Sequence, residues 1–259
     1  MGVDYMVELD CGPKERHGAE GLVQMMKSRA AVDAIVDQMR QAGDTRPLDQ
    51  ITITKRLTRP EGEVDTKVTI TELRASSAPL DAERAHCKAC SADRGTGGFG
   101  CYGYIHYPVP ANAESWMMGR IPAELDSPAM FLLKSAIKDF SYDGAPSRTM
   151  RDAGPMFFEA RQPVTRDWGK KRMFRGHELS ITSDQIFHLM FHVGTIQPMH
   201  AAMICVFLGV AEMDILGDLS RLGSVRVPQP DARGPAQLAQ FLQTLAFAAS
   251  RGLEISISA

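Results

Sequence analysis

The 259-residue sequence has no apolar run long enough to cross a membrane. Its longest apolar stretch, Ala201 to Val210, is about half the length of the ~20-residue segment that a membrane helix needs. The N-terminus also lacks the basic segment and apolar core of a signal peptide. We therefore expect a cytoplasmic protein with no membrane partner.

Neither sign of charge dominates, because the sequence has 29 Lys and Arg residues and 31 Asp and Glu residues. The sequence also lacks the basic stripe with which nucleic-acid-binding proteins displace counterions from phosphates. We therefore expect no nucleic-acid partner. Apolar residues make up 44% of the chain, which suits a globular protein that builds its core without disulfide staples.

Short catalytic motifs are absent as well, including the nucleophile elbow, the Walker A loop and the kinase set. His188 and His192 stand four residues apart, at a spacing that suits metal ligands on one helix face. Leu189 occupies the position where a zinc protease carries glutamate, so no general base lies between the two histidines. We interpret the pair as a polar helix face that is solvated or faces a partner. Whether the protein is an enzyme stays open.

Cysteine is the residue type that stands out, because three of the five cysteines form the pattern C-x2-C-x10-C at Cys87, Cys90 and Cys101. A C-x2-C pair presents two sulfurs to one ion from a single tight turn, and zinc binds four tetrahedral ligands, thiolates among them. Four glycines before Cys101 allow the chain to turn back sharply. Cytoplasmic thiols stay reduced, which favours metal ligation over disulfides. We predict a structural zinc site.

The fourth ligand has three candidates. We favour Cys11, at the inner end of an expected strand, over His86, which is adjacent to Cys87 and therefore binds the same ion less readily. His106 is the third option. The predicted metal ligands are thus Cys87, Cys90, Cys101 and Cys11.

Three other interpretations of the cysteine stretch remain open. An iron–sulfur cluster also uses four cysteines with C-x2-C spacing. Cys87 and Cys90 could form a redox disulfide, or the cysteines could be ordinary buried or surface residues. Cys205 lies in an apolar helical stretch and is expected to be a small core residue.

Hydrophobic periodicity predicts an α+β fold. In the N-terminal region we expect a strand at 5–11, a helix at 19–42, a β-hairpin at 51–58 and 64–71, a polar connector at 75–84 and a strand at 102–109. The first strand and the hairpin are expected to form one three-stranded antiparallel sheet with one helix. Further on we expect helices at 111–119, 127–140, 183–192, 198–210 and 236–251, an irregular stretch at 141–182 and a short strand at 253–257.

This pattern divides the chain into an α+β region with the cysteine knuckle, 1–110, and a mostly helical region, 111–259, packed on it, unless the two form one continuous domain. Two functions fit. The first is a binding or regulatory module whose structural zinc orders a surface for a protein partner. The alternative is a metal-dependent enzyme, with an open zinc site or an iron–sulfur cluster in the same stretch. The sequence gives no oligomeric state.

Overall fold

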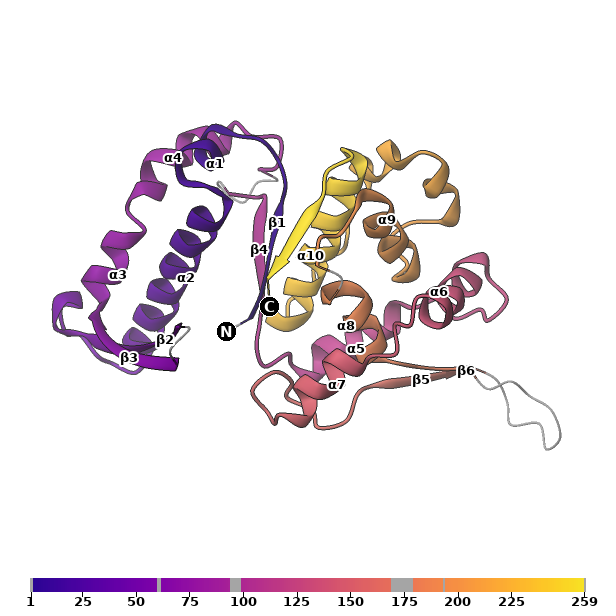
Figure 1. The fold of residues 1–259 in the computed structure, drawn as a ribbon, viewed down its shortest axis with the longest axis horizontal. Coiled ribbons are helices and arrows are strands. Elements are labelled where there is room, and N and C mark those ends of the chain that lie inside the picture. Colours follow the sequence, from indigo (N-terminus) through magenta and orange to yellow (C-terminus); the bar gives the residue numbers. More distant parts are fainter. Residues whose placement is uncertain (1, 60–61, 94–98, 169–178, 193, 259) are drawn as a thin grey trace. The chain divides into compact units, whose positions relative to one another are not determined.

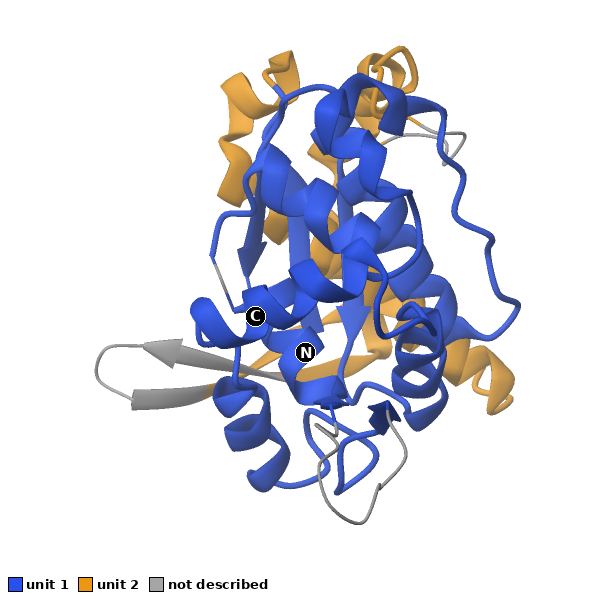
Figure 2. Cartoon of the chain, turned by 90° about the vertical axis from the view of Figure 1, so that its right-hand side faces the viewer, with its two compact units in different colours: residues 1–9, 101–259 blue, residues 10–100 orange. Residues whose placement is uncertain are grey.

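A computed structural model describes residues 2–59, 62–93, 99–168, 179–192 and 194–258 (Figure 1). By packing, the chain divides into two compact units (Figure 2). Unit 1 consists of Met1–Leu9 and Cys101–Ala259, and unit 2 consists of Asp10–Gly100. The chain therefore leaves unit 1 after its first strand, builds unit 2 and returns. Both units contain helices and small antiparallel sheets, so the predicted α+β class is confirmed.

The sheet of unit 1 has β1 (Gly2–Val7) in the centre, with β4 (Tyr102–His106) and β7 (Ile255–Ser258) antiparallel on either side. The prediction that the first strand pairs with the hairpin is therefore wrong. The physical reason is that β4 and β7 already occupy both edges of β1.

One cross-strand pair in this sheet shows how closely unit 1 is packed. Tyr5 on β1 stands opposite Gly103 on β4. A Cβ atom on Gly103 would lie 2.2 Å from the Tyr5 hydroxyl oxygen, so only glycine leaves room for the ring. The ring packs edge-on against Phe241, with 4.9 Å between the centroids. Such pairs join the sheet to the helical core.

Six helices and a second β-ribbon complete the regular elements that we name in unit 1. The helices are α5 (Ala111–Arg120), α6 (Pro128–Asp139), α7 (Ala145–Asp152), α8 (Ser183–Phe191), α9 (Pro198–Phe207) and α10 (Arg233–Ser250). The ribbon pairs β5 (Thr165–Trp168) with β6 (Leu179–Thr182). α9 packs on α10, and both bury nearly all of their apolar side chains. The expectation that Cys205 is a core residue is confirmed, since it is fully buried on α9.

The stretch at 141–182, expected to be irregular, contains α7, β5 and β6. α7 is short and mostly polar, so it shows little apolar periodicity in the sequence. Gly144 starts it from a left-handed backbone conformation with φ of 78°. Two of its polar residues, Ser147 and Arg151, are buried. A helix that buries polar side chains is invisible to a search for apolar stripes.

Unit 2 consists of four helices, a β-hairpin and a short 3₁₀ turn, η1 (Leu48–Gln50). Its elements are α1 (Gly12–His17), α2 (Ala19–Gln41), β2 (Thr52–Arg59), β3 (Gly62–Thr69), α3 (Ile70–Ser76) and α4 (Pro79–Lys88). The predicted long helix and the hairpin are both confirmed. The core cluster contains Val32, Ile51, Ile70 and Leu73 and is bordered by half-buried side chains.

The expected polar connector at 75–84 is wrong, because α3 continues to Ser76 and α4 begins at Pro79. Proline suits the first turn of a helix, where its missing N–H has no partner to lose. Leu80, Glu83 and Cys87 share the buried face of α4. One of the three is a carboxylate, which hides the stripe from a hydrophobicity pattern.

In the part of the chain that the structure describes, no helix has the length and apolar character that crossing a membrane requires.

Candidate functional site

Unit 2 places the C-x2-C pair at the end of α4. Cys87 is buried in the last turn of the helix, and Cys90 is half-buried in the turn that follows. The N–H of Cys90 donates to the Cys87 carbonyl over 3.1 Å, which closes this turn. The N–H of Ala92 donates to the Cys90 Sγ over 3.5 Å. Both sulfurs therefore come from one compact turn.

The residues that follow Cys90 fold back onto the same turn. The backbone N–H of Phe99 donates to the Cys87 sulfur. A Cβ atom on Gly100 would lie 2.0 Å from the Ala92 carbonyl oxygen, so glycine is required at this close approach. The glycines at 95, 97 and 98, which we expected to turn the chain, lie outside the described residues.

Cys11 comes from the other end of unit 2 and reaches the same neighbourhood. It is the residue before α1 and has an extended backbone conformation. Burial raises the pKa of the Cys87 thiol, and negative charge on Cys11 and on Cys90 raises it further, whereas the Phe99 N–H opposes this. An electrostatic effect of this kind requires the thiols to be close. The structure thus places Cys11, Cys87 and Cys90 in the same unit, with Cys11 near enough to Cys87 to affect its pKa.

After unit 2, the chain re-enters unit 1 at Cys101. Cys101 is buried, and its carbonyl oxygen accepts a hydrogen bond from the Val7 N–H over 2.8 Å. Within the described ranges, no three His, Cys, Asp or Glu side chains are arranged so that they could hold a metal ion. The five cysteines all lie within the described residues, and none of them forms a disulfide. The zinc site and its fourth ligand therefore stay predictions.

The two histidines weighed as alternative ligands lie in different units. His86 is exposed on α4. His106 lies on β4 in unit 1, packs edge-on against Tyr104 with 4.6 Å between ring centroids, and contacts the Arg233 guanidinium. Burial, with the Arg233 charge, lowers the pKa of His106.

A buried carboxylate lies one helical turn before Cys87. The Glu83 side chain is 8% exposed and accepts from Arg16 Nε over 2.9 Å and from His17 Nε2 over 3.0 Å. Arg16 Nη2 donates to its second oxygen. The Arg16 hydrogen bond lowers the pKa of Glu83 to about 2. Sequence patterns gave no indication of this group, which we call the Glu83 clamp.

The histidine pair of α8 is not a solvated stripe. The His188 side chain is 16% exposed, and its Nδ1 accepts from the Gly144 N–H over 3.3 Å. Its ring lies edge-on to Tyr142 and 6.0 Å from the His192 ring. Burial lowers the pKa of both histidines. The Gly144 N–H directed at Nδ1 favours the neutral form of the ring, whereas Asp143, with Oδ1 3.7 Å from Nδ1, favours the charged form.

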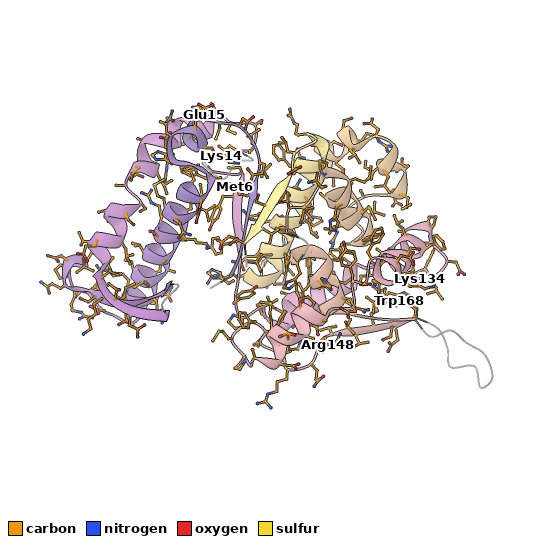
Figure 3. The ribbon with its side chains drawn as sticks, in the orientation of Figure 1. Met6, Lys14, Glu15, Lys134, Arg148 and Trp168 are labelled. Carbon is orange, nitrogen blue, oxygen red and sulfur yellow. The ribbon has the colours of Figure 1, made fainter. Side chains whose placement is uncertain are left out.

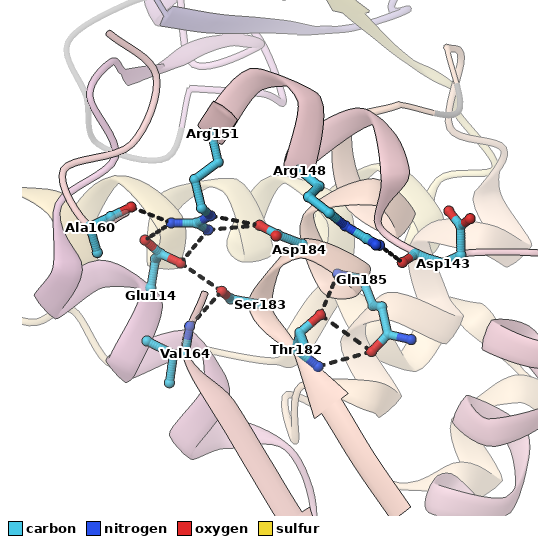
Figure 4. Close-up of polar contacts among 10 residues, drawn as sticks. All are labelled: Glu114, Asp143, Arg148, Arg151, Ala160, Val164, Thr182, Ser183, Asp184 and Gln185. Atoms are coloured by element: carbon cyan, nitrogen blue, oxygen red, sulfur yellow. Dashed lines mark hydrogen bonds and ion pairs between the residues drawn. The ribbon is translucent and has the colours of Figure 1, made fainter. Parts of the chain in front are cut away.

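Unit 1 contains one further polar cluster that the sequence did not reveal (Figure 4). Arg151 on α7 donates to Glu114 on α5 over 2.8 and 3.1 Å and to Asp184 on α8 over 2.7 and 3.1 Å. Its Nη1 also donates to the Ala160 carbonyl over 2.7 Å. The Ser183 hydroxyl donates to Glu114 over 2.6 Å. All five N–H groups of the guanidinium are thereby directed at oxygen atoms.

The Arg151 cluster is best explained as a structural tie between three helices. Arg151 is 2% exposed, Glu114 is fully buried and Asp184 is 3% exposed. Burial disfavours the charge on Arg151, but the two carboxylates outweigh it and raise its pKa. An adjoining pocket of about 450 Å³ also exposes the neighbouring Arg148 and Arg161. Saturated hydrogen bonding leaves Arg151 no donor for a ligand, so this cluster is not our candidate.

Comparisons with known proteins found no protein-family model, no curated protein and no solved structure that matches this chain.

Proposed function

We propose that this protein binds one zinc ion through unit 2, with Cys11, Cys87 and Cys90 as ligands and Cys101 as the fourth ligand predicted from the sequence. The observation that carries the proposal is the placement of Cys11. It lies far from Cys87 along the chain, yet the fold of unit 2 brings it within electrostatic range of that thiol. The separation of the two cysteines in the sequence does not by itself predict that they lie near each other.

The hydrogen bonds around the sulfurs also support metal binding. Backbone N–H groups of Phe99 and Ala92 donate to the Cys87 and Cys90 sulfurs. The Phe99 N–H opposes the rise in the pKa of Cys87 that burial causes, and the thiolate is the form that binds a metal. In metal sites such donors also orient the ligands.

The thin core of unit 2 explains why a metal would help it fold. One core cluster has four buried side chains, and Leu22, Met26 and Leu80 are buried as well, but many of the other apolar side chains of the unit are half-exposed. A metal that binds the folded unit and not the unfolded chain adds its binding free energy to folding. Small units with limited cores commonly use such a staple.

On this proposal the metal is structural, and unit 2 is a cytoplasmic binding or regulatory module for a protein partner rather than for nucleic acid. The near-balanced charge of the chain supports this choice, since it supplies no basic footprint for phosphates. The reducing cytoplasm would keep the three thiols free to bind the ion.

Metal analysis of the full chain, purified without chelator under anaerobic conditions, tests the proposal. We expect about one zinc per chain with no visible absorbance. We expect that Cys11→Ser, Cys87→Ser and Cys90→Ser each lose the zinc. Cys205→Ala is the matched control, because it removes a thiol buried in unit 1 and should keep the metal. A wild-type chain without metal, or Cys11→Ser with full zinc content, would contradict the proposal.

The same experiment addresses the second candidate function, a metal-dependent enzyme. The observation that favours it is that unit 2 supplies three cysteines, the number of protein ligands that a catalytic zinc keeps. If Cys101→Ser retains zinc while the other three variants lose it, the site has an open position and enzymatic chemistry is favoured. Iron with thiolate-to-iron absorption would point to a cluster with redox chemistry.

A further inference from the structure

α1, the helix that starts directly after Cys11, has little to hold it in place. It has six residues, fewer than two turns, and helices this short are unstable on their own. Pro13 is its one buried residue. In the described part of the chain, the Cys11 thiol makes no capping hydrogen bond to the helix. Figure 3 labels Lys14 and Glu15 on this helix, of which Glu15 is exposed. The position of Cys11 therefore depends on the contacts that α1 makes with α2 and α4.

The Glu83 clamp supplies the side-chain hydrogen bonds between α1 and α4. Arg16 and His17, in the last turn of α1, both bind the carboxylate of Glu83 on α4. Cys11 precedes α1, and Cys87 lies one turn after Glu83 on α4. α1 packs on α2 and on α4, and these two pairings require α1 and α4 to run antiparallel. The Arg16 side chain folds back along α1, since a Cβ atom on Gly12 would lie 3.0 Å from its Nη1 atom. A fixed clamp therefore sets how closely Cys11 approaches Cys87.

We propose that Glu83 is a positioning residue of the metal site, because its bonds to Arg16 and His17 hold Cys11 against Cys87. The inference rests on the proposed zinc site and names a residue that governs its affinity without touching the ion. Outer-shell partners of metal ligands typically change metal affinity by 10- to 100-fold when they are lost. Glu83 acts in that manner, through the helix that carries Cys11.

α4 provides a matched control for this effect. Asp81 lies two residues before Glu83 and accepts from Arg29 on α2 over 2.6 and 3.0 Å. Asp81→Asn removes an ion pair between α4 and α2, whereas Glu83→Gln removes the ion pair between α4 and α1. Both substitutions keep the length and polarity of the side chain nearly unchanged.

The test is a cobalt(II) titration of the metal-free full chain, followed by its thiolate and tetrahedral absorption bands and by competition with a chelator. We expect Glu83→Gln to weaken cobalt binding about 10-fold or more and to reduce the thiolate band, while Asp81→Asn stays close to wild type. Arg16→Met, which removes an exposed partner of Glu83, should weaken binding in the same direction even if Glu83→Gln folds poorly. Equal affinities for wild type, Glu83→Gln and Arg16→Met would overturn the inference while leaving the zinc site standing.

A second readout needs no metal. In a chain carrying Cys90→Ser and Cys101→Ser, oxidised glutathione should join Cys11 to Cys87, with two glutathione molecules released. We expect Glu83→Gln to slow the formation of this disulfide, and Asp81→Asn to leave the rate unchanged. If the wild-type chain bound no cobalt, the zinc proposal would fail. An unchanged disulfide rate in Glu83→Gln would then overturn the positioning role as well.

Discussion

Unit 1 and unit 2 differ in how they are held together. In unit 1, α9 and α10 bury almost continuous apolar faces, and rings such as Phe241 join them to Tyr5 on the central strand. In unit 2, the core cluster is bordered by partly exposed side chains, including Ile35 and Val36 on α2. The unit with the thinner core is also the one that gathers three cysteines. This is the unit in which we propose that metal binding compensates for a limited core.

The ion pairs of the two units also differ, because those of unit 1 are more deeply buried. Arg151 in unit 1 has two carboxylate partners and is itself 2% exposed. Glu83 in unit 2 is nearly as buried, but its partner Arg16 is 54% exposed. Solvent screens an ion pair that it reaches. The unit 1 cluster therefore holds its helices firmly, and the Glu83 clamp is the weaker tie.

The largest effect of a single substitution should come from Arg151→Met in unit 1. It leaves Glu114 and Asp184 as uncompensated buried carboxylates, which typically costs about 3–5 kcal/mol. The measurement is the free energy of unfolding in urea. Arg221→Met is the control, because its pair with Asp214 is more than half exposed on both sides and should cost within about 1 kcal/mol. Equal costs for the two variants would break the comparison.

A pair of leucine truncations should give the next largest difference. Leu238 on α10 is fully buried, so Leu238→Ala should leave a rigid cavity and destabilise unit 1 by about 2–5 kcal/mol. Leu73 in unit 2 is 8% exposed and lies beside half-buried neighbours that can move into the space. Leu73→Ala should therefore cost less than Leu238→Ala. Hydrogen exchange resolved along the chain measures both, and the reverse order would show that unit 2 is packed as tightly as unit 1.

The smallest effect is a difference in how the two units respond to acid. Burial lowers the pKa of His200 in unit 1, and its Nε2 is buried with no hydrogen-bond partner among the described residues. Folding therefore favours the neutral ring. That contribution is fully present above the ordinary histidine pKa of about 6.5 and is lost as pH falls below it.

Glu83 in unit 2 is an acid, and its contribution to stability is lost at a lower pH than the contribution of His200. Its pKa is lowered to about 2, so its contribution is present above the ordinary value of 4.5 and is lost as pH falls from there toward 2. Hydrogen exchange of the metal-free chain should show unit 1 weakening between about pH 7 and 5, before the clamp is affected. In the His200→Gln variant, unit 1 should lose less protection over this pH range. An unchanged loss of protection would show that His200 is not its cause.

Long periodic segments could be predicted from the sequence. The helix at 19–42 and the hairpin around 59–62 rest on local patterns that their tertiary surroundings did not change. The C-x2-C turn is local in the same way. Its two cysteines lie within four residues, so backbone geometry alone places them together.

The features that the sequence did not reveal depend on contacts between distant segments. β1 pairs with β4 and β7, and nothing in its own alternation specifies those partners. In the sequence, Glu83 has the pattern of a solvent-facing charge. Only in the fold do Arg16 and His17 form hydrogen bonds to its carboxylate. Only the tertiary fold supplies such pairings, and polar groups buried in pairs leave no apolar pattern.

Hydrogen exchange of the full chain before and after removal of metal by a chelator tests the central claim most directly. The account predicts that amides in unit 2, residues 10–100, lose most of their protection, while α9 and α10 in unit 1 keep theirs. Equal protection of unit 2 with and without chelator, in a chain shown to contain the metal beforehand, would contradict it.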